Sequence, residues 1–476
     1  MISGGFLCLH GVMDSAHAEI VEVANMKREQ LGSRLGFILI SAGCAIGIGN
    51  VWKFPYLVGQ NGGGLFVLIY LVFLIALGVP VLTMEFAMGR AAKRSVCSIY
   101  QPLEPKGSKW HWHGGVALVG NVILMMFYTS VSAWMFQYFV RCAGGAFEGL
   151  DPQGVADAFD SMLADPVGMT VSVAVVVALG FFVCSLGLRN GLERVSKVMM
   201  SALLLIMLVL TVHSVTLPGA REGVAFYLLP NPAQMRDKSL LDVVVAAMNQ
   251  AFFTLSVGMG SMAVFGSYIG RERSLLGEAV NVAALDTFVA VVSGLIIFPA
   301  CFAYGVAPDQ GPKLIFVTLP NIFNHMSGGR LWGSLFFVFM SFAAFSTVIG
   351  VLETLIAGLM ELTGWSRRKT CLIGGAGLFL LSLPCALGFS ILSGVQPMGE
   401  GSTIMDVEDF AVSNLILPIG SLLFVLFCTC RYGWGWDRFM QEANQGKGLK
   451  VRTWMRPYLT WVLPVAILVI IVLGLR

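Results

Sequence analysis

Charged side chains are scarce in this chain of 476 residues: Asp, Glu, Lys and Arg make up 12% of it, whereas 57% of the residues are hydrophobic. The mean hydropathy of +0.80 agrees with this balance. Such a composition excludes an ordinary soluble enzyme and is typical of a protein that crosses a membrane many times. We therefore expect the lipid bilayer to surround the chain, and we expect no nucleic-acid partner.

The ten cysteines form neither a zinc-binding spacing nor a disulfide framework, and their one close pair is Cys428 and Cys430. His111 and His113 alternate with tryptophans, which favours an anchor at the membrane interface over a metal site. No nucleophile and base stand in a catalytic pattern, and the Gly47-Ile48-Gly49 run lacks the strand-turn-helix context of a nucleotide-binding loop. We expect a protein that is not an enzyme.

Residues 1–26 lack the positively charged start and the clean apolar stretch of a signal peptide. We expect this segment to be a disordered extension. The alternative is a misassigned start, with Met26 as the natural first residue.

Long apolar segments are abundant, and each is long enough to cross a bilayer as a helix of about 20 residues. Eleven can be placed, at residues 35–59, 63–89, 114–140, 168–188, 195–217, 241–269, 282–306, 331–360, 371–390, 410–430 and 458–475. The sequence therefore predicts an all-α polytopic membrane protein with 11 transmembrane helices.

The distribution of Lys and Arg predicts the orientation, because positively charged loops stay on the cytoplasmic side. With the N-terminus inside, cytoplasmic segments hold 22 of the 30 basic residues, outer segments hold seven, and Lys53 lies within the first span. An odd number of spans places the C-terminus outside. We expect a multi-pass membrane protein with this orientation, and the resemblance described below implies the bacterial cytoplasmic (inner) membrane.

Two of the apolar segments contain glycine-rich interruptions, at residues 43–50 and 253–260. Irregular backbone at membrane depth persists where it lines a protein-enclosed cavity, because its polar groups cannot stay unpaired in lipid. The interruptions fall in spans one and six, so the first ten spans divide into two inverted groups of five that each begin with a broken helix. The alternative for Gly43 and Gly47 is a small-residue face for helix packing.

Several stretches together resemble the neurotransmitter:sodium symporter family, and in particular its bacterial amino-acid transporters. They are Arg34-Leu35-Gly36, Gly47 to Tyr56, Asn61 to Gly64, Glu85 to Arg90, Gln250 to Ser256 and Asp406 to Phe410. The resemblance covers roughly residues 27–430. It implies two inverted five-helix repeats, at residues 27–217 and 218–430, with broken helices 1 and 6, followed by a cytoplasmic loop at 431–457 and an eleventh helix at 458–476.

The resemblance further implies coupled uptake of sodium with an amino acid or amine, and two sodium sites built from oxygen ligands. The first would use the carbonyls of Ala45 and Thr254, the Thr254 hydroxyl, the side chains of Asn50 and Asp286, and the carboxylate of the substrate. The second would use the carbonyls of Gly43, Ile46 and Ala343 and the hydroxyls of Ser346 and Thr347. Sharing of the first ion with the substrate would couple their affinities.

Asp286 also predicts how the transporter handles chloride. Many relatives bind chloride near the first sodium through a hydroxyl on span 7, and the matching residue here is Ala290. Asp286 would supply the negative charge instead, so no chloride requirement is expected. The alternative is a structural aspartate that is bonded to neighbouring hydroxyls.

The substrate site is implied at the two interruptions. The amides of Ile48 and Gly49 and the Tyr128 hydroxyl would bind a carboxylate, because a free helix N-terminus favours an anion. Carbonyls of Ala45, Phe253 and Ser256 would bind the ammonium group. Gly47 stands where amine transporters carry an aspartate, which favours an amino acid, and the side-chain pocket is implied to be formed by Leu124, Tyr128, Phe253, Ser256, Met259, Thr347 and Val351.

Such a pocket is apolar and suits a neutral hydrophobic L-amino acid, aliphatic or aromatic. By the same resemblance, Lys53 and Asp409 form an outer gate, while Arg28 and Glu361, with Tyr268 nearby, form an inner one. Glu85 would be structural and would accept hydrogen bonds from backbone groups freed by the interruptions. We expect a sodium symporter that works by alternating access as a monomer or weak homodimer. The alternative is a membrane receptor or channel-like relative that binds amino acids without coupled transport.

Overall fold

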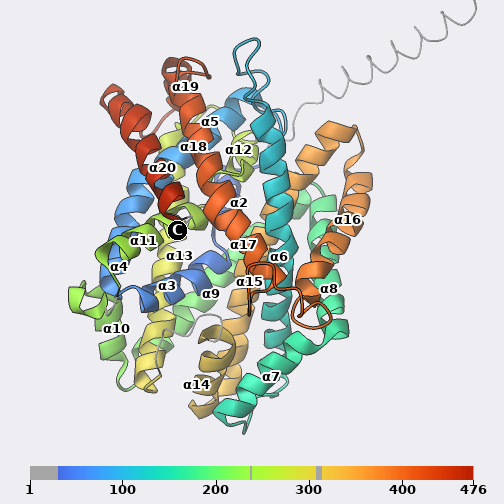
Figure 1. The fold of residues 1–476 in the computed structure, drawn as a ribbon, viewed down its shortest axis with the longest axis vertical. Coiled ribbons are helices and arrows are strands. Elements are labelled where there is room, and N and C mark those ends of the chain that lie inside the picture. Colours follow the sequence, from blue (N-terminus) through green and yellow to red (C-terminus); the bar gives the residue numbers. More distant parts are fainter. Residues whose placement is uncertain (1–30, 236–237, 307–313, 475–476) are drawn as a thin grey trace, which may run out of the picture.

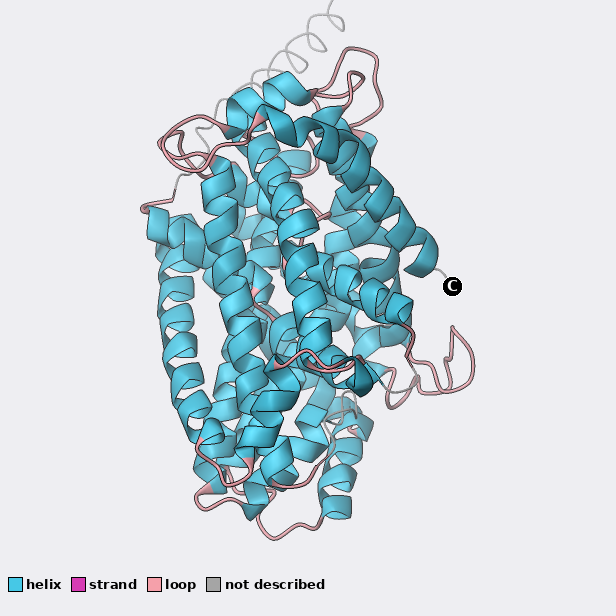
Figure 2. Ribbon diagram, turned by 90° about the vertical axis from the view of Figure 1, so that its left-hand side faces the viewer, coloured by secondary structure: helices cyan, strands magenta, loops and turns pink. Residues whose placement is uncertain are grey.

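The computed structural model describes residues 31–235, 238–306 and 314–474, and within these ranges the chain is built from helices without any β-strand. Most of the helices run along the long axis of the molecule and are joined by short loops (Figures 1 and 2). This confirms the predicted all-helical class. The expected extension at residues 1–26 lies outside the described residues.

The first predicted interruption divides span one into two helices. Helix α2 (Arg34–Ala45) begins at Ser33, whose side chain accepts a hydrogen bond from the Gly36 amide, and it ends at Ile46, which has an extended conformation (φ −70°, ψ 98°). The chain then resumes a helical course through η1 (Gly49–Lys53) and α3 (Phe54–Gln60). The two halves differ in direction by 55°.

The second interruption separates α11 (Leu240–Thr254) from α12 (Ser261–Gly266). Ser239 and Asp242 form a reciprocal capping box that starts α11. Between the two helices Gly258 (φ +103°) and Gly260 (φ +74°) adopt positive φ values, which glycine allows without the steric cost of a Cβ atom. Both predicted breaks in the helices are therefore present.

Nine helices of the described chain are long and apolar enough to cross a membrane, and the bent pair α2 and α3 raises that number to ten. The sixth predicted span, at residues 241–269, is divided between α11 and α12, each too short to cross alone, so the count of 11 stays a prediction, as do the domain boundaries. The nine spans are Gly64–Ala92, Trp112–Ala143, Pro166–Ser185, Leu188–Val215, Leu275–Ala303, Gly329–Thr363, Arg367–Leu387, Ile404–Thr429 and Thr453–Gly474.

Several of these spans contain a single π-helical segment or a short helix at one end. Their parts are α4 (Gly64–Phe73), η2 (Leu74–Gly78), α5 (Val79–Ala92), α6 (Trp112–Ala143), α8 (Pro166–Ser185), η3 (Leu188–Glu193), α9 (Arg194–Val215), α13 (Leu275–Ala303), α15 (Gly329–Thr363), α16 (Arg367–Leu387), α17 (Ile404–Phe410), η6 (Ala411–Ile416), α18 (Leu417–Thr429), η7 (Thr453–Met455), η8 (Tyr458–Val462) and α20 (Leu463–Gly474). The shorter elements of the connections are α7 (Pro152–Ala164), α10 (Ala220–Leu228), η4 (Pro232–Met235), η5 (Leu314–Thr318), α14 (Leu319–His325) and α19 (Trp436–Ala443).

The long helices α6 and α15 pack against each other through the centre of the molecule. Helix α2 lies against α15, α13 and α9, and α12 lies against α5. At the periphery α8, α16 and α20 leave most of their apolar surface uncovered, as helices that face lipid do. The break of the first span therefore lies against the central helix α15, and the second half of the other broken span lies against α5.

Candidate functional site

A cavity with an empty volume of about 340 Å³ lies where the two interruptions meet α6 and α15. Its wall is made by Ala45, Gly47, Gly49, Leu124, Tyr128, Phe253, Ser256, Met259, Thr347 and Leu417. Nine of these ten residues were predicted to bind substrate. Ile48 and Val351 were also predicted, but both are buried and lie outside the lining.

Leu417 is the lining residue that sequence reasoning missed. It is the first residue of α18 and comes from span ten, which carries no interruption that would single it out. Its carbonyl lies close to Gly258, where an added Cβ would overlap with it. Span ten therefore contributes to the cavity through its packing against the second interruption.

The N-terminal end of the resumed first span presents its amides beside the cavity. The Ile48 amide donates to the Tyr128 hydroxyl over 2.9 Å, and the Gly47 amide donates to Asn50 Oδ1 over 3.2 Å. A Cβ atom added at Gly47 would overlap with the hydroxyl groups of Tyr128 and Thr347. Glycine at this position is thus what allows α6 and α15 to approach the interruption so closely.

The three side chains predicted for the first sodium site form one hydrogen-bonded group. Asn50 Nδ2 donates to Asp286 Oδ1 over 2.9 Å, and the Thr254 hydroxyl donates to Asp286 Oδ2 over 3.0 Å. Asp286 is fully buried. In the ranges that the structure describes, no Lys, Arg or His lies within ion-pair distance of it, so an uncompensated carboxylate is held beside the cavity.

An isolated buried carboxylate is costly, and a bound cation would offset that cost. Asn50, Thr254 and Asp286 bring together an amide oxygen, a hydroxyl oxygen and carboxylate oxygens. Oxygen donors of this kind are what a hard cation prefers. The residues present therefore fit a sodium ion.

The five residues predicted for the second sodium site also lie together, where α15 passes the end of α2. The Ser346 hydroxyl is 3.3 Å from the Ile46 carbonyl and 2.9 Å from the Ala343 carbonyl. The Thr347 hydroxyl is 3.4 Å from the Gly43 carbonyl and 3.3 Å from that of Ile46. Carbonyls that the end of α2 leaves without helical partners are thus grouped with two hydroxyls, which is again a set of oxygen donors.

Glu85 on α5 supports the second interruption. This fully buried carboxylate accepts a hydrogen bond from the Gly258 amide. The contact satisfies a backbone group that the break in the helix has freed, in a region where water is scarce. This hydrogen bond is the kind of contact that the predicted structural role of Glu85 requires, and the role itself stays a prediction.

Lys53 and Asp409 face each other above the cavity. Lys53 Nζ lies 3.4 Å from each carboxylate oxygen of Asp409 and 3.1 Å from the Ser413 hydroxyl. It also lies 4.1 Å from the centre of the Phe253 ring, which lines the cavity. These contacts connect the first interrupted span to span ten directly over the second interruption.

The described residues contain one side of the other expected gate. Arg28 lies outside the described residues. Glu361 accepts hydrogen bonds from Arg94, the Ser95 amide and the Ser98 hydroxyl. These partners come from the loop after α5, which the sequence did not single out.

Tyr268 was expected near that pair. Among the described residues its hydroxyl donates over 2.8 Å to Glu353, which forms an ion pair with Arg367. The inner gate of Arg28, Glu361 and Tyr268 therefore stays a prediction. Glu353 could have been found from sequence as an acid within a span that needs a partner, but its pairing with Arg367 could not.

Comparisons with known proteins agree on the family of sodium-dependent transporters that this chain resembles. The model of the sodium:neurotransmitter symporter family matches residues 28–147 and 156–476. An uncharacterized sodium-dependent transporter of Bacillus subtilis, YhdH, is 34% identical over 450 residues, which cover 94% of this chain and 98% of that protein. An uncharacterized sodium-dependent transporter of Haemophilus influenzae is 30% identical, with 95% and 99% covered.

Among solved structures, the crystal structure of MhsT in complex with L-phenylalanine is similar in both sequence and fold. It is 34% identical to this chain, with a TM-score of 0.84, and the match covers 94% of this chain and all of MhsT. At this level of similarity the arrangement of the helices is shared along nearly the whole chain.

Proposed function

This chain belongs to the sodium:neurotransmitter symporter family, and from that premise we propose that it couples sodium to the uptake of neutral hydrophobic L-amino acids by alternating access. The observation that carries the substrate class is the cavity itself, whose ten lining residues include no charged side chain. A charged substrate side chain would be left there without a partner, which is costly. The bound L-phenylalanine of MhsT supports the same class.

We propose that the substrate lies with its carboxylate toward the amides of Ile48 and Gly49 and the Tyr128 hydroxyl. The amides carry the partial positive charge of a helix N-terminus. The ammonium group would meet the carbonyls of Ala45, Phe253 and Ser256. Leu124, Met259 and the newly found Leu417 would then surround the apolar side chain, and the flexible methionine would adapt to several shapes.

Sodium is a co-substrate in this proposal and would bind at two places. The first is the group of Asn50, Thr254 and Asp286 together with the Ala45 carbonyl, close to the substrate carboxylate. The second is the group of Gly43, Ile46, Ala343, Ser346 and Thr347. An ion at the first place and the substrate would each raise the affinity of the other by the same factor.

The proposed transport does not need chloride. Ala290 on α13 has no hydroxyl that could bind an anion, while Asp286, one helical turn earlier, would supply the negative charge instead. Replacing chloride by gluconate should leave uptake unchanged. Uptake that collapses in gluconate would contradict this part of the proposal.

We propose the two gates from the same family membership. Lys53 and Asp409 would close the outer side, and Arg28 and Glu361, near Tyr268, the inner side. Lysine lacks the planar fork of an arginine and cannot form two parallel bonds with a carboxylate, so the outer gate should open readily. We further propose a bacterial cytoplasmic membrane location, an N-terminus inside, a C-terminus outside, and a monomer or weak homodimer.

Uptake into proteoliposomes tests the proposal. Purified protein should accumulate radiolabelled phenylalanine or leucine when sodium is imposed outside, and the twenty amino acids should be screened as competitors. Accumulation that persists when choline replaces sodium would contradict coupling. Sodium-dependent binding without accumulation would instead favour the receptor or channel-like alternative.

A further inference from the structure

Glu408 on α17 is a buried carboxylate that the proposed transport site does not use. Glu408 is 6% exposed, and apart from the Cys385 thiol its oxygen atoms have no hydrogen-bond partner within the described chain. No Lys, Arg or His of the described ranges lies within ion-pair distance of it. Buried polar groups are nearly always paired, so an exception of this kind requires an explanation.

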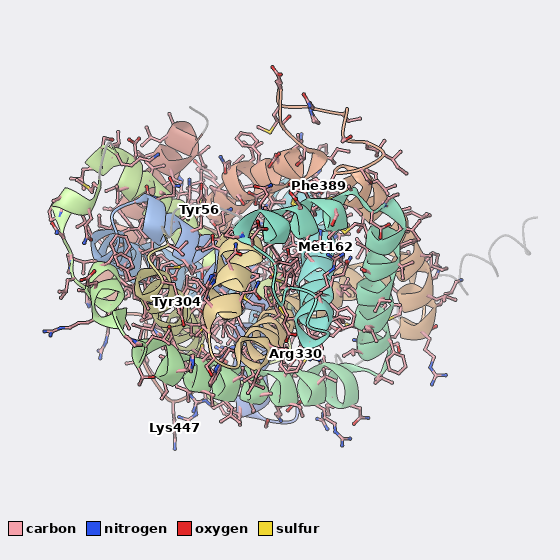
Figure 3. The ribbon with its side chains drawn as sticks, turned by 90° about the horizontal axis from the view of Figure 1, so that it is seen from below. Tyr56, Met162, Tyr304, Arg330, Phe389 and Lys447 are labelled. Carbon is pink, nitrogen blue, oxygen red and sulfur yellow. The ribbon has the colours of Figure 1, made fainter. Side chains whose placement is uncertain are left out.

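The groups around Glu408 come from α6 and α16. On α6, which packs against α17, the Trp134 indole nitrogen is buried without a hydrogen-bond partner, one helical turn from Ser130. The Cys385 thiol of α16 faces both Ser130 and Glu408. Trp134 packs against Phe389 just beyond α16, with ring centres 5.3 Å apart, at the end of the bundle that Figure 3 views.

The titratable groups near Glu408 are few. Of the elements that pack against α17, α16 provides the Cys385 thiol, whereas the side chains that α6 and η6 place there do not titrate. Helix α17 itself carries Asp406 and Asp409. Asp409 is paired with Lys53, and Asp406 accepts the hydrogen bonds that cap the helix at Thr403.

These surroundings favour a proton over a metal ion as the ligand. A sodium ion needs several oxygen ligands, whereas the polar group that faces the Glu408 carboxylate from another helix is the Cys385 thiol. An unpaired carboxylate in an apolar environment is costly, and it neutralises by binding a proton. We propose that Glu408 is a proton-binding site, whose carboxyl group is neutral in the conformation that the structure describes.

Glu408 is adjacent to the proposed outer gate of Lys53 and Asp409. The link between proton binding and this gate rests on the proposed function. Glu408 immediately precedes Asp409, which holds Lys53 over the cavity. Any opening of that gate which moves α17 outward would bring Glu408 into water and favour loss of its proton. By linkage, protons on the outer side would stabilise the closed gate.

Infrared spectroscopy tests the proton site without any substrate, so its outcome is independent of whether the chain transports amino acids. At neutral pH the purified protein in lipid should show the stretching band of protonated carboxylic acids, and Glu408→Gln should remove one carboxyl group from that band. The matched control is Glu400→Gln, because Glu400 is exposed on the loop before α17, and this variant should leave the band unchanged. An identical band in the wild type and in Glu408→Gln would overturn the proposal.

A second pair of variants covers the case in which Glu408→Gln fails to fold. Cys385→Ala removes the thiol that faces Glu408 and should shift the frequency of the Glu408 component. Cys371→Ala, at another buried cysteine of the same helix, should not. A band that is the same in wild type and Cys385→Ala would also count against a protonated Glu408.

Discussion

At the scale of single residues, Asp286 is where sodium coupling can be tested most directly. Asn50 and Thr254 hold its carboxylate from two sides, and the described chain places no basic side chain next to it. Asp286→Asn keeps the shape and removes the charge. We expect the sodium concentration for half-maximal substrate binding to rise roughly tenfold or more, which corresponds to about 1.4 kcal/mol.

Scintillation proximity binding over a sodium titration would measure this effect. Asp160→Asn is the control, because Asp160 is exposed on α7 and far from the interruptions in sequence. A gain of chloride dependence in Asp286→Asn would also fit the proposal, since an anion could then replace the lost charge. A sodium response identical to that of the wild type would exclude Asp286 from the site.

A substitution at Gly47 is expected to change the affinity for the substrate. In Gly47→Ala the new methyl group would overlap with the hydroxyls of Tyr128 and Thr347, so both side chains must shift away from the cavity. Phenylalanine affinity should fall about tenfold, or ~1.4 kcal/mol. Gly115→Ala on α6 is the control, because a Cβ there meets no atom within 4 Å. Equal affinities in the two variants would show that the space at Gly47 is not needed.

At the scale of helices and their interruptions, Gly258 shows how the second break is maintained. Its φ of +103° disfavours any residue with a Cβ atom, and such an atom would also overlap with the Leu417 carbonyl of α18. Gly258→Ala should therefore lower the free energy of unfolding by about 1–3 kcal/mol, the usual cost of a strained backbone position.

Thermal unfolding in detergent would measure the loss of stability, and Gly364→Ala separates its two causes. Gly364 ends α15 with φ +68°, but a Cβ there has no neighbour within 4 Å. We expect the control to lose about 1 kcal/mol from backbone strain alone. If Gly258→Ala unfolds at the same temperature as Gly364→Ala, then the close approach of α18 adds nothing.

The helical elements also show what a sequence can predict. Long apolar segments and glycine-rich interruptions are local signals, so both broken helices and most of the cavity could be foreseen. Leu417 could not, because a residue in a continuous apolar span looks like any other until the packing of that span is known. The same holds for Ile48 and Val351, whose burial away from the cavity depends on side-chain directions in the folded protein.

At the scale of the whole molecule, ion pairs between distant segments were the hardest contacts to predict. Arg90 and Glu442 form a buried pair although 352 positions separate them, and Arg94 rather than another basic residue contacts Glu361 in the described chain. Each acid has many basic residues elsewhere in the chain as possible partners, since the chain holds 30 Lys and Arg residues. Only the tertiary packing determines which basic residue forms the ion pair. The family resemblance therefore predicted the residues that line the cavity better than it predicted these ion pairs.

The pair of Arg367 with Glu353 connects several spans. The Arg367 guanidinium on α16 also donates to the Cys184 carbonyl at the end of α8, and Glu353 accepts from Tyr268, which follows α12 of the second broken span. Glu353 is 1% exposed, so removing Arg367 would leave its carboxylate buried without that cation. The cost of such a loss is about 3–5 kcal/mol, and it should favour conformations in which water reaches Glu353.

Arg367→Gln should therefore shift the transporter toward an inward-open state. The native thiol of Cys44, fully buried on α2 next to the cavity, reports that opening if the other cysteines are replaced. We expect a maleimide to label Cys44 roughly fivefold or more faster in Arg367→Gln, a factor that corresponds to about 1 kcal/mol. Arg368→Gln is the control, because Arg368 is an exposed neighbour. Equal labelling rates in the two variants would mean that the Arg367 contact does not hold the inner side closed, and the closure would then depend on Glu361 and its partners.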